Sequence, residues 1–441
     1  MKNMTTFLYE WKHFVRSPFK MLALLLFIVA SVYGLHKGAH VFQKQRAEVA
    51  KMKQKVEEER QIYLSAYQEG LFVPEDRPWV DMRTPLWAIE YAWVYHYKVP
   101  SPAMVYSIGQ SEQYGFIKKI TRWASPYDTD LAEEIANPER LQTGTLDFSF
   151  ALLFLSPLLL LVLVYNIQSM ETEQGFMPLI EVQNGSKRSW LVSRMMFYVL
   201  LLCLVNVLLI SYGATLTGVE IASSLALGQV ILYSFAYVAF WSLLYFLILQ
   251  GGKSISENTL KMVGMYLIFA FIIPATVSQY LSIRRPASLM TAFLDAKLDK
   301  RWDIWDQPTY DRQAQLVELF PEIADSPLLR DTTKLDRAIR ESTSALENQL
   351  QKASIRPVEE ENEAKNTFIK RTFWFNPVSF FQNRFNSVAQ THYDDYQNYR
   401  DEIQQLVDVQ IQVLILDMWA DKKVDEEQYV KYYEILRKLE K

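Results

Sequence analysis

The chain has 441 residues, 50% of them hydrophobic and 22% charged, proportions that an ordinary soluble protein would also show. Its formal net charge of -4 argues against a nucleic-acid-binding protein, which normally carries an excess of basic residues on its binding face. The single cysteine, Cys203, excludes an internal disulfide framework. Charged and apolar residues are nevertheless segregated along the chain, which indicates that different segments lie in different solvents.

Five segments are long and apolar enough to cross the hydrocarbon core of a membrane, which takes roughly 20 helical residues. They comprise residues 19–35, 148–167, 191–214, 224–250 and 260–282. Pro157 and Pro274 lie inside two of these segments, where neighbouring helices can bind the carbonyls that a proline leaves free. No clean cleavage site follows the first segment, so we expect it to be retained as a signal-anchor helix.

Basic residues in short connections mark the cytoplasmic side of a membrane protein. Here they precede the first segment, separate the second from the third and follow the fourth: Lys2, Lys12, Arg16, Lys20, Lys187, Arg188, Lys253 and Lys261. Connection 215–223 holds Glu220 and no Lys or Arg, whereas Arg284 and Arg285 after the fifth segment oppose the pattern. Because the other connections agree, we expect a multi-pass protein of a bacterial inner membrane with a cytoplasmic N-terminus.

The predicted fold class is therefore an all-α integral membrane protein with about five transmembrane helices and two large, mainly helical extracytoplasmic domains. Residues 1–36 would form an interfacial helix and the first span, and residues 37–147 the first outer domain. Residues 148–282 would form the other four spans, with the cytoplasmic segment 168–190 between the second and third. Residues 283–441 would form the second outer domain.

Within the outer regions, residues 43–68 contain no Gly or Pro and predict a helix that continues out of the first span. Residues 72–102 favour irregular packed structure, with Trp79, Trp87 and Trp93 as core or interface anchors. Further helices are predicted over residues 328–353 and 387–420, separated by a solvated acidic turn at 359–363. The stretch 406–419 contains Asp and Gln, so we interpret it as an amphipathic helix and not as a sixth span.

The connection METEQGFMPLI at 170–180, followed by GSKR at 185–188 and SR at 193–194, resembles the cytoplasmic connection of ABC-2 type permeases. LYEWKHFVRSP at 8–18 is similar to the interfacial helix before their first span. The long insertion after that span, together with NPVSFFQ at 376–382, resembles the branch related to gliding-motility and nitrous-oxide-reductase-maturation permeases.

This resemblance implies the membrane-spanning subunit of an ATP-driven exporter, in which a short surface helix couples the spans to a separate ATPase. The residues that it assigns to coupling are Glu171, Glu173, Gly175, Phe176, Leu179 and Ile180. ATP and Mg would be bound by the ATPase subunit and no cofactor by this chain. The other partners implied are a second copy or a paralogous permease, membrane lipid and a periplasmic protein, with no nucleic acid.

The chain shows no catalytic motif of its own. Gly252-Lys253-Ser254 imitates the end of a P-loop, but Leu247 stands where its first glycine is required. His36 and His40 are spaced to share a helix face, yet two histidines without a third ligand favour interfacial residues over a metal site. The aromatic run 393–399 favours helix packing over partner binding. We therefore expect no enzyme; the alternative to an exporter is a protein that transmits ATP-driven motion to envelope partners without transport.

Overall fold

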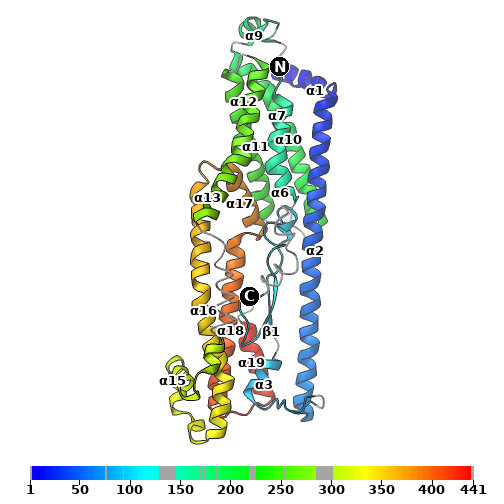
Figure 1. The fold of residues 1–441 in the computed structure, drawn as a ribbon. Helices are drawn as coiled ribbons and strands as arrows, with labels where there is room; N and C mark the ends of the chain where they lie inside the picture. The colour runs from blue at the N-terminus through cyan, green and yellow to red at the C-terminus, as the bar shows by residue number, and fades with distance from the viewer. Residues whose placement is uncertain are drawn as a thin grey trace.

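The computed structural model describes residues 2–74, 77–92, 94–128, 146–168, 171–172, 174–184, 186–217, 225–251, 254–284 and 301–438. The described chain is elongated and mainly helical (Figure 1). Apolar helices form one half, which we call the apolar half (described residues of 18–42, 148–168 and 187–284). Polar helices form the other, which we call the polar half (described residues of 43–128, 301–372 and 393–438).

Two helices begin the chain. Helix α1 (Lys2–Val15) lies across the end of the apolar half, and α2 (Pro18–Glu69) then runs the length of both halves (Figure 1). Pro18 suits the first turn of α2, and Gly70, with φ of 74°, ends it in the left-handed conformation that glycine tolerates. The predicted helix over residues 43–68 is thus confirmed, as a continuation of α2.

Among the residues that the structure describes, four helices are long and apolar enough to cross a membrane. They are α2, α10 (Lys187–Leu216), α11 (Leu225–Gly251) and the continuous helix Ile255–Arg284, which comprises α12 (Ile255–Leu267), the π-helical turn η4 (Ile268–Ile272) and α13 (Ile273–Arg284). The predicted segment 148–167 forms the shorter apolar helix Phe148–Val164, made of α6 (Phe148–Phe150), the π-helical turn η2 (Ala151–Leu155) and α7 (Ser156–Val164). Its crossing of the membrane stays a prediction.

Each π-helical turn directly precedes a helix that contains a proline, Pro157 in α7 and Pro274 in α13. Proline has no N–H, so the carbonyl four residues earlier loses its helical donor and the regular hydrogen-bond pattern is interrupted there. For Pro157 that carbonyl belongs to Leu153, and the hydroxyl of Tyr237 on α11 donates to it at 2.5 Å. Tyr266 on α12 donates to the neighbouring carbonyl of Phe154 at 3.0 Å. The neighbouring helices thus bind the carbonyl that Pro157 leaves free.

The polar half contains a small sheet that an all-α prediction omits. Strands β1 (Val94–Tyr97) and β2 (Ile117–Ile120) pair antiparallel, with Val94 opposite Ile120 and Tyr97 opposite Ile117. Helix α3 (Pro85–Tyr91) and the 3-10 turn η1 (Pro102–Val105) flank β1. Residues 72–102 are therefore less irregular than predicted. Trp79 is exposed, Trp87 is half-buried, and Trp93 lies outside the described residues.

The carboxy-terminal helices differ from the predicted ones. They are α15 (Thr309–Leu319), the 3-10 turns η5 (Pro321–Asp325) and η6 (Pro327–Arg330), α16 (Thr332–Thr372), α17 (Pro377–Ala389), α18 (Tyr393–Trp419) and α19 (Glu426–Lys438). The predicted turn at 359–363 is wrong, because α16 continues through it: glutamate favours helix, and Arg356 pairs with Glu360 at 2.8 Å. The predicted helix 387–420 is interrupted at Gln390, whose φ is 56°.

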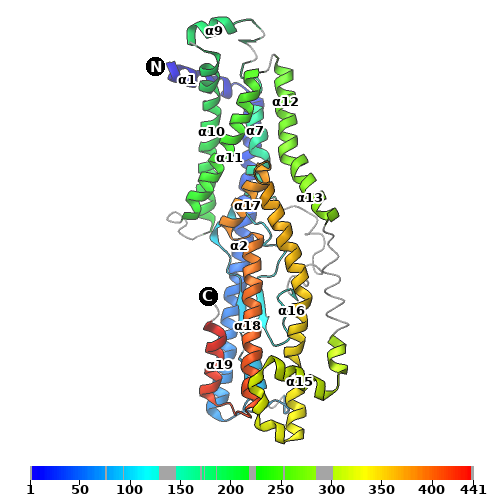
Figure 2. The ribbon, with the colours of Figure 1, turned by 90° about the vertical axis from the view of Figure 1, so that its left-hand side faces the viewer.

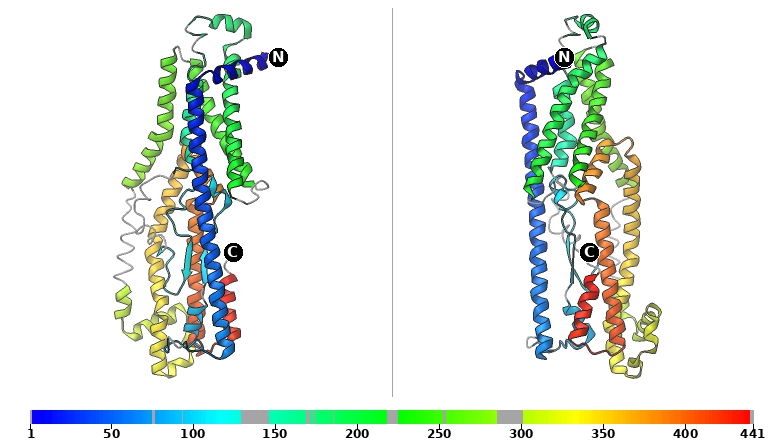
Figure 3. Two further views of the ribbon diagram at one scale, coloured as in Figure 1. Left: turned by 90° about the vertical axis from the view of Figure 1, so that its right-hand side faces the viewer. Right: turned by 180° about the vertical axis from the view of Figure 1, so that it is seen from behind.

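The two polar regions that the sequence separates share hydrophobic clusters. Ile120 and Ala124 pack with Leu406 and Trp419, and α3 packs with Tyr429 and its neighbours on α19. Helix α17 leaves the polar half and packs against α11, with ring centroids of Phe381 and Tyr237 5.0 Å apart (Figures 2 and 3). The polar half is therefore joined to the apolar half through both α2 and α17.

Candidate functional site

One end of the apolar half gathers the segments that the sequence assigns to coupling. Helix α9 (Met177–Asn184) lies at this end beside α1, the end of α7 and the start of α10 (Figure 1). The end of α11 and the start of α12 lie there as well (Figure 2). We call this the α9 end. The N-terminal helix and the described residues of 165–186 and 251–254 thus share one end of the molecule.

Four charged side chains meet beneath the surface of the α9 end, and we call them the ionic network: Glu10, Lys20, Glu171 and Arg194. Arg194 on α10 donates through Nε to Glu10 of α1, and through Nη1 to Glu171 at 2.5 Å. The second carboxylate oxygen of Glu10 accepts from the hydroxyl of Tyr198 at 2.9 Å. One guanidinium therefore joins α1, α10 and the segment that leads to α9.

Lys20 extends the network to α2 and α7. Its ammonium donates to the carbonyl of Leu163 at 2.7 Å and to Tyr198 at 3.2 Å. Leu163 lies in the last turn of α7, where a cation favours the carbonyl end of the helix dipole. Nearby on α1, burial, with a contribution from Lys20, lowers the pKa of His13 below its ordinary value. Burial at this position therefore favours the neutral form of the imidazole.

Burial makes this network energetically sensitive. The residues Glu10, Lys20 and Arg194 are 0%, 1% and 5% exposed. Two cations face two carboxylates, so the four charges balance and removing any single member leaves a net charge in the cluster. Removing one partner of a buried ion pair costs about 3–5 kcal/mol, because it leaves an uncompensated charge away from water. The network therefore fixes how α1, α2, α7 and α10 meet.

The predicted coupling residues divide between this network and the surface. Glu171 contributes to the network, whereas the resemblance assigned it to coupling with the ATPase subunit. Gly175, with φ of 72°, turns the chain into α9, and Phe176 and Leu179 are 51% and 56% exposed. Ile180 is half-buried. Glu173 lies outside the described residues.

Sequence reasoning missed Glu10, Lys20 and Tyr198 as members of the site and assigned Arg194 only to the start of a span. A signal was present, because Glu10 is the sole acidic residue in the basic stretch 1–20 and Lys20 interrupts an apolar run. Lys20 is buried and so does not contribute to the surface charge from which orientation was predicted. Val182 on α9, 83% exposed, was missed as well.

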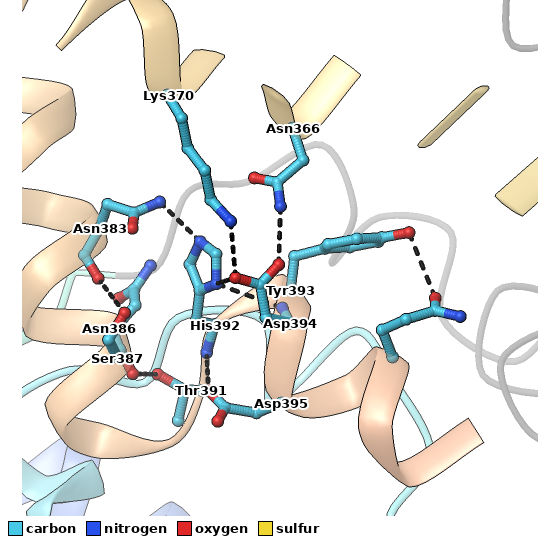
Figure 4. A network of polar contacts seen from close by, with 11 residues as sticks. Asn366, Lys370, Asn383, Asn386, Ser387, Thr391, His392, Tyr393, Asp394 and Asp395 are labelled. Carbon is cyan, nitrogen blue, oxygen red and sulfur yellow. Dashed lines mark hydrogen bonds and ion pairs between the residues drawn. The ribbon is translucent and has the colours of Figure 1, made fainter. Parts of the chain in front are cut away.

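A second polar cluster lies where α16, α17 and α18 meet (Figure 4). His392 caps α18. Its ring nitrogen Nδ1 accepts from the backbone N–H of Asp394 at 3.2 Å, and the backbone N–H of His392 donates to the Asp395 carboxylate at 3.0 Å. Lys370 and Asn366 of α16 donate to Asp394 at 2.8 and 2.7 Å. Asn383 of α17 lies 2.6 Å from His392 Nε2. The cluster holds the corner at which the chain re-enters the polar half.

We expect acid to weaken this corner through His392. Burial lowers the pKa of His392 below its ordinary value of 6.5, although Asp394 lies nearby. Below pH 6.5 the unfolded chain therefore binds more protons at this residue, and stability falls as the pH drops through the folded-state pKa. A proton on Nδ1 would also remove the acceptor for Asp394 N–H.

Thermal unfolding of the wild type and of His392→Asn at pH 7.5 and pH 5.0 measures this effect. Asn caps helices without titrating, so the variant should lose less stability in acid than the wild type. Lys370, Asp394 and Asp395 lie beside position 392 in both proteins, so the difference between the two losses reports the charge on the imidazole together with its effect on these neighbours. Equal losses in the two proteins would show that His392 is not the sensitive group.

The histidine pair and the P-loop-like stretch were the other candidates that the sequence raised. No group of three or more His, Cys, Asp or Glu side chains that could hold a metal ion occurs among those residues. His36 binds the hydroxyl of Tyr212 through Nε2 at 2.9 Å. Gly252 and Lys253 lie outside the described residues, and Ser254 caps α12 by accepting from Glu257 N–H at 3.2 Å.

Comparison of the chain with protein-family models, with curated proteins and with solved structures finds no match. The function of the chain is therefore inferred from the geometry of the α9 end and from the resemblance of its sequence.

Proposed function

We propose that this chain is the membrane-spanning subunit of an ABC-2 type exporter in a bacterial inner membrane, with the α9 end in the cytoplasm. The observation that supports the proposal is the exposed apolar stripe of α9, defined by Phe176, Leu179 and Val182. This stripe is connected through the ionic network to α1, α2 and α10. A nucleotide-binding subunit seated on the stripe would bind ATP and Mg and supply the driving motion.

The stripe has the chemistry of a protein-docking surface. Phe176 directly precedes the first residue of α9, Leu179 and Val182 follow it at spacings of three, and Val182 is 83% exposed. Burying a Phe and a Leu contributes about 1.5–3 kcal/mol for each side chain. Membrane lipid is a poor alternative partner for the stripe, because α9 lies beyond the ends of α10 and α11 (Figure 2).

The ionic network then explains how movement of α9 reaches the spans. Glu171 precedes α9 by only a few residues and is held to Arg194 on α10. Arg194 in turn holds Glu10, and so α1, while Lys20 joins α2 to the end of α7. A force on α9 therefore acts on a connected set of helices, which is the arrangement required to turn closure of two ATPase subunits into movement of the spans.

A second candidate function is transmission of motion to envelope partners without transport. The observation that favours it is the unbroken α2, whose 52 residues run from the α9 end to the far end of the polar half (Figure 1). At 1.5 Å per residue this rod is about 80 Å long, so displacement at its start is carried to its end. A periplasmic partner at the polar half, and a second copy of this chain or a paralogous permease, would complete either assembly.

The proposed function is tested by the ATPase activity that co-purifies with the affinity-tagged chain from its native membrane. We expect Phe176→Ser with Leu179→Ser to lower this activity more than tenfold, because two apolar anchors are lost. Leu71→Ser with Val73→Ser, which also replaces two exposed apolar residues but at the far end of the molecule, is the matched control. Undiminished activity with the α9 variant, or none with the wild type, would contradict the proposal.

A further inference from the structure

The outer face of the apolar half carries a cavity that the proposed function does not use. Five residues of one α13 face line it: Pro274, Val277, Ser278, Leu281 and Ser282. Lys365 and Ile369 of α16 and Ser379 of α17 close the opposite side, around a volume of about 340 Å³. Of α13, only Leu281 is buried, so the cavity opens beside a helix that lies on the outside of the bundle (Figure 2).

A second cavity, of about 550 Å³, adjoins the first, since Leu281 lines both. It lies toward the polar half, between the last turn of α13 and one face of α16. Tyr280 of α13 stacks on Phe368 of α16 with ring centroids 5.2 Å apart, and the Arg284 guanidinium lies 6.0 Å from the Tyr280 ring. Aromatic and basic side chains of this kind mark the boundary between hydrocarbon and water.

The charges around the two cavities are not balanced. Arg284, Lys365 and Arg371 line them and form no ion pair with any other residue that the structure describes. Of the two acidic residues there, Glu360 is paired with Arg356 at 2.8 Å, which leaves Glu363 alone against three cations. Three minus one leaves an excess of two positive charges beside an apolar surface.

We propose that these cavities bind an anionic glycerophospholipid from the surrounding bilayer. Arg284, Lys365 and Arg371 would bind the phosphodiester, because basic pockets at the ends of spans recognise such headgroups. An acyl chain would lie along Pro274, Val277 and Leu281, in contact with the hydrocarbon core. The site requires that Ile255–Arg284 cross the membrane, and it is independent of the ATPase partner.

Native mass spectrometry of the detergent-purified chain tests the site, with dioleoyl-phosphatidylglycerol or dioleoyl-phosphatidylcholine added as the probe. We expect the wild type to retain at least tenfold more of the anionic lipid. Arg284→Gln, Lys365→Gln and Arg371→Gln together should lower its retention to that of phosphatidylcholine. The matched control removes three exposed cations far from the cavities: Arg330→Gln, Arg340→Gln and Lys423→Gln. This control should bind as the wild type does.

A second variant keeps the cations and fills the apolar cavity. Ser278 is exposed on the α13 face, so Ser278→Trp should be tolerated by the fold and should lower retention of phosphatidylglycerol several-fold. Free sn-glycerol 3-phosphate, which has the headgroup charge without the acyl chains, should not displace the lipid. Equal binding of both lipids by the wild type, anionic-lipid binding unchanged in both cavity variants, or displacement by glycerol phosphate would overturn the proposal.

Discussion

Replacing Arg194 with Met is expected to destabilise the chain by about 3–5 kcal/mol, the cost of leaving a buried ion pair half made. Glu10 is 0% exposed and would keep its carboxylate without a guanidinium partner. The Tyr198 hydroxyl and the Lys20 ammonium stay nearby, but neither contacts both carboxylates as Arg194 does. Unfolding in detergent, followed by circular dichroism against denaturant, measures the change.

A double-mutant cycle separates the pair from its surroundings. Adding Glu10→Gln to Arg194→Met should recover part of the lost stability, because the uncompensated charge is removed. The control is Lys261→Gln, which breaks the exposed ion pair with Glu257 and should change stability by no more than about 1 kcal/mol. If Arg194→Met were as mild as this control, the ionic network would not hold the α9 end together.

The second large effect is expected where α2 touches the loops that join the two halves. A Cβ atom added to Gly34 would lie 2.5 Å from the backbone carbon of Asp147, and one added to Gly38 would lie 2.5 Å from the carbonyl oxygen of Val105. Backbone atoms cannot move aside as a flexible side chain does. We therefore expect Gly34→Ala and Gly38→Ala each to destabilise by about 1–3 kcal/mol, although alanine favours helix.

Gly264→Ala is the matched control for these substitutions. Gly264 is also a helical glycine of the apolar half, and a Cβ added there would meet nothing within 4 Å. Its replacement should change the free energy of unfolding by no more than about 1 kcal/mol, in the stabilising direction. Measuring all three variants by the same denaturant series checks the expectation. Equal effects at Gly38 and Gly264 would show that α2 can shift without cost.

The elements that the sequence predicts well are those whose signal is local. Hydropathy over a single segment is sufficient to locate α10, α11 and Ile255–Arg284, and the run without Gly or Pro predicts the long α2. Composition alone also favours helix across residues 359–363. The predicted turn there is wrong because a run of acidic residues indicates exposure to solvent and not the end of a helix. Gln390 interrupts the predicted helix 387–420 as the left-handed C-cap of α17. Glycine or asparagine usually takes that position, so the sequence carries no comparable local signal there.

Features that join distant parts of the chain could not be predicted from one sequence. Glu10 and Arg194 are 184 residues apart, and the local sequence around either residue does not indicate which residue it contacts. The same holds for β1 and β2, and for Ile120 against Trp419 in the shared core of the polar half. The resemblance assigned Phe176 and Leu179 of the stripe, whereas Val182 and most of the ionic network became evident only in the structure.

The central claim is that the α9 end faces the cytoplasm and the far end of α2 lies outside. Val182 and Leu71 are exposed residues at opposite ends of the molecule. Each is replaced singly, as Val182→Cys or Leu71→Cys, in a Cys203→Ala background that removes the native thiol. A membrane-impermeant maleimide applied to spheroplasts should label Leu71→Cys at once and Val182→Cys only after permeabilisation. Labelling of both positions from the same side, or of Val182→Cys alone in intact spheroplasts, would contradict the account.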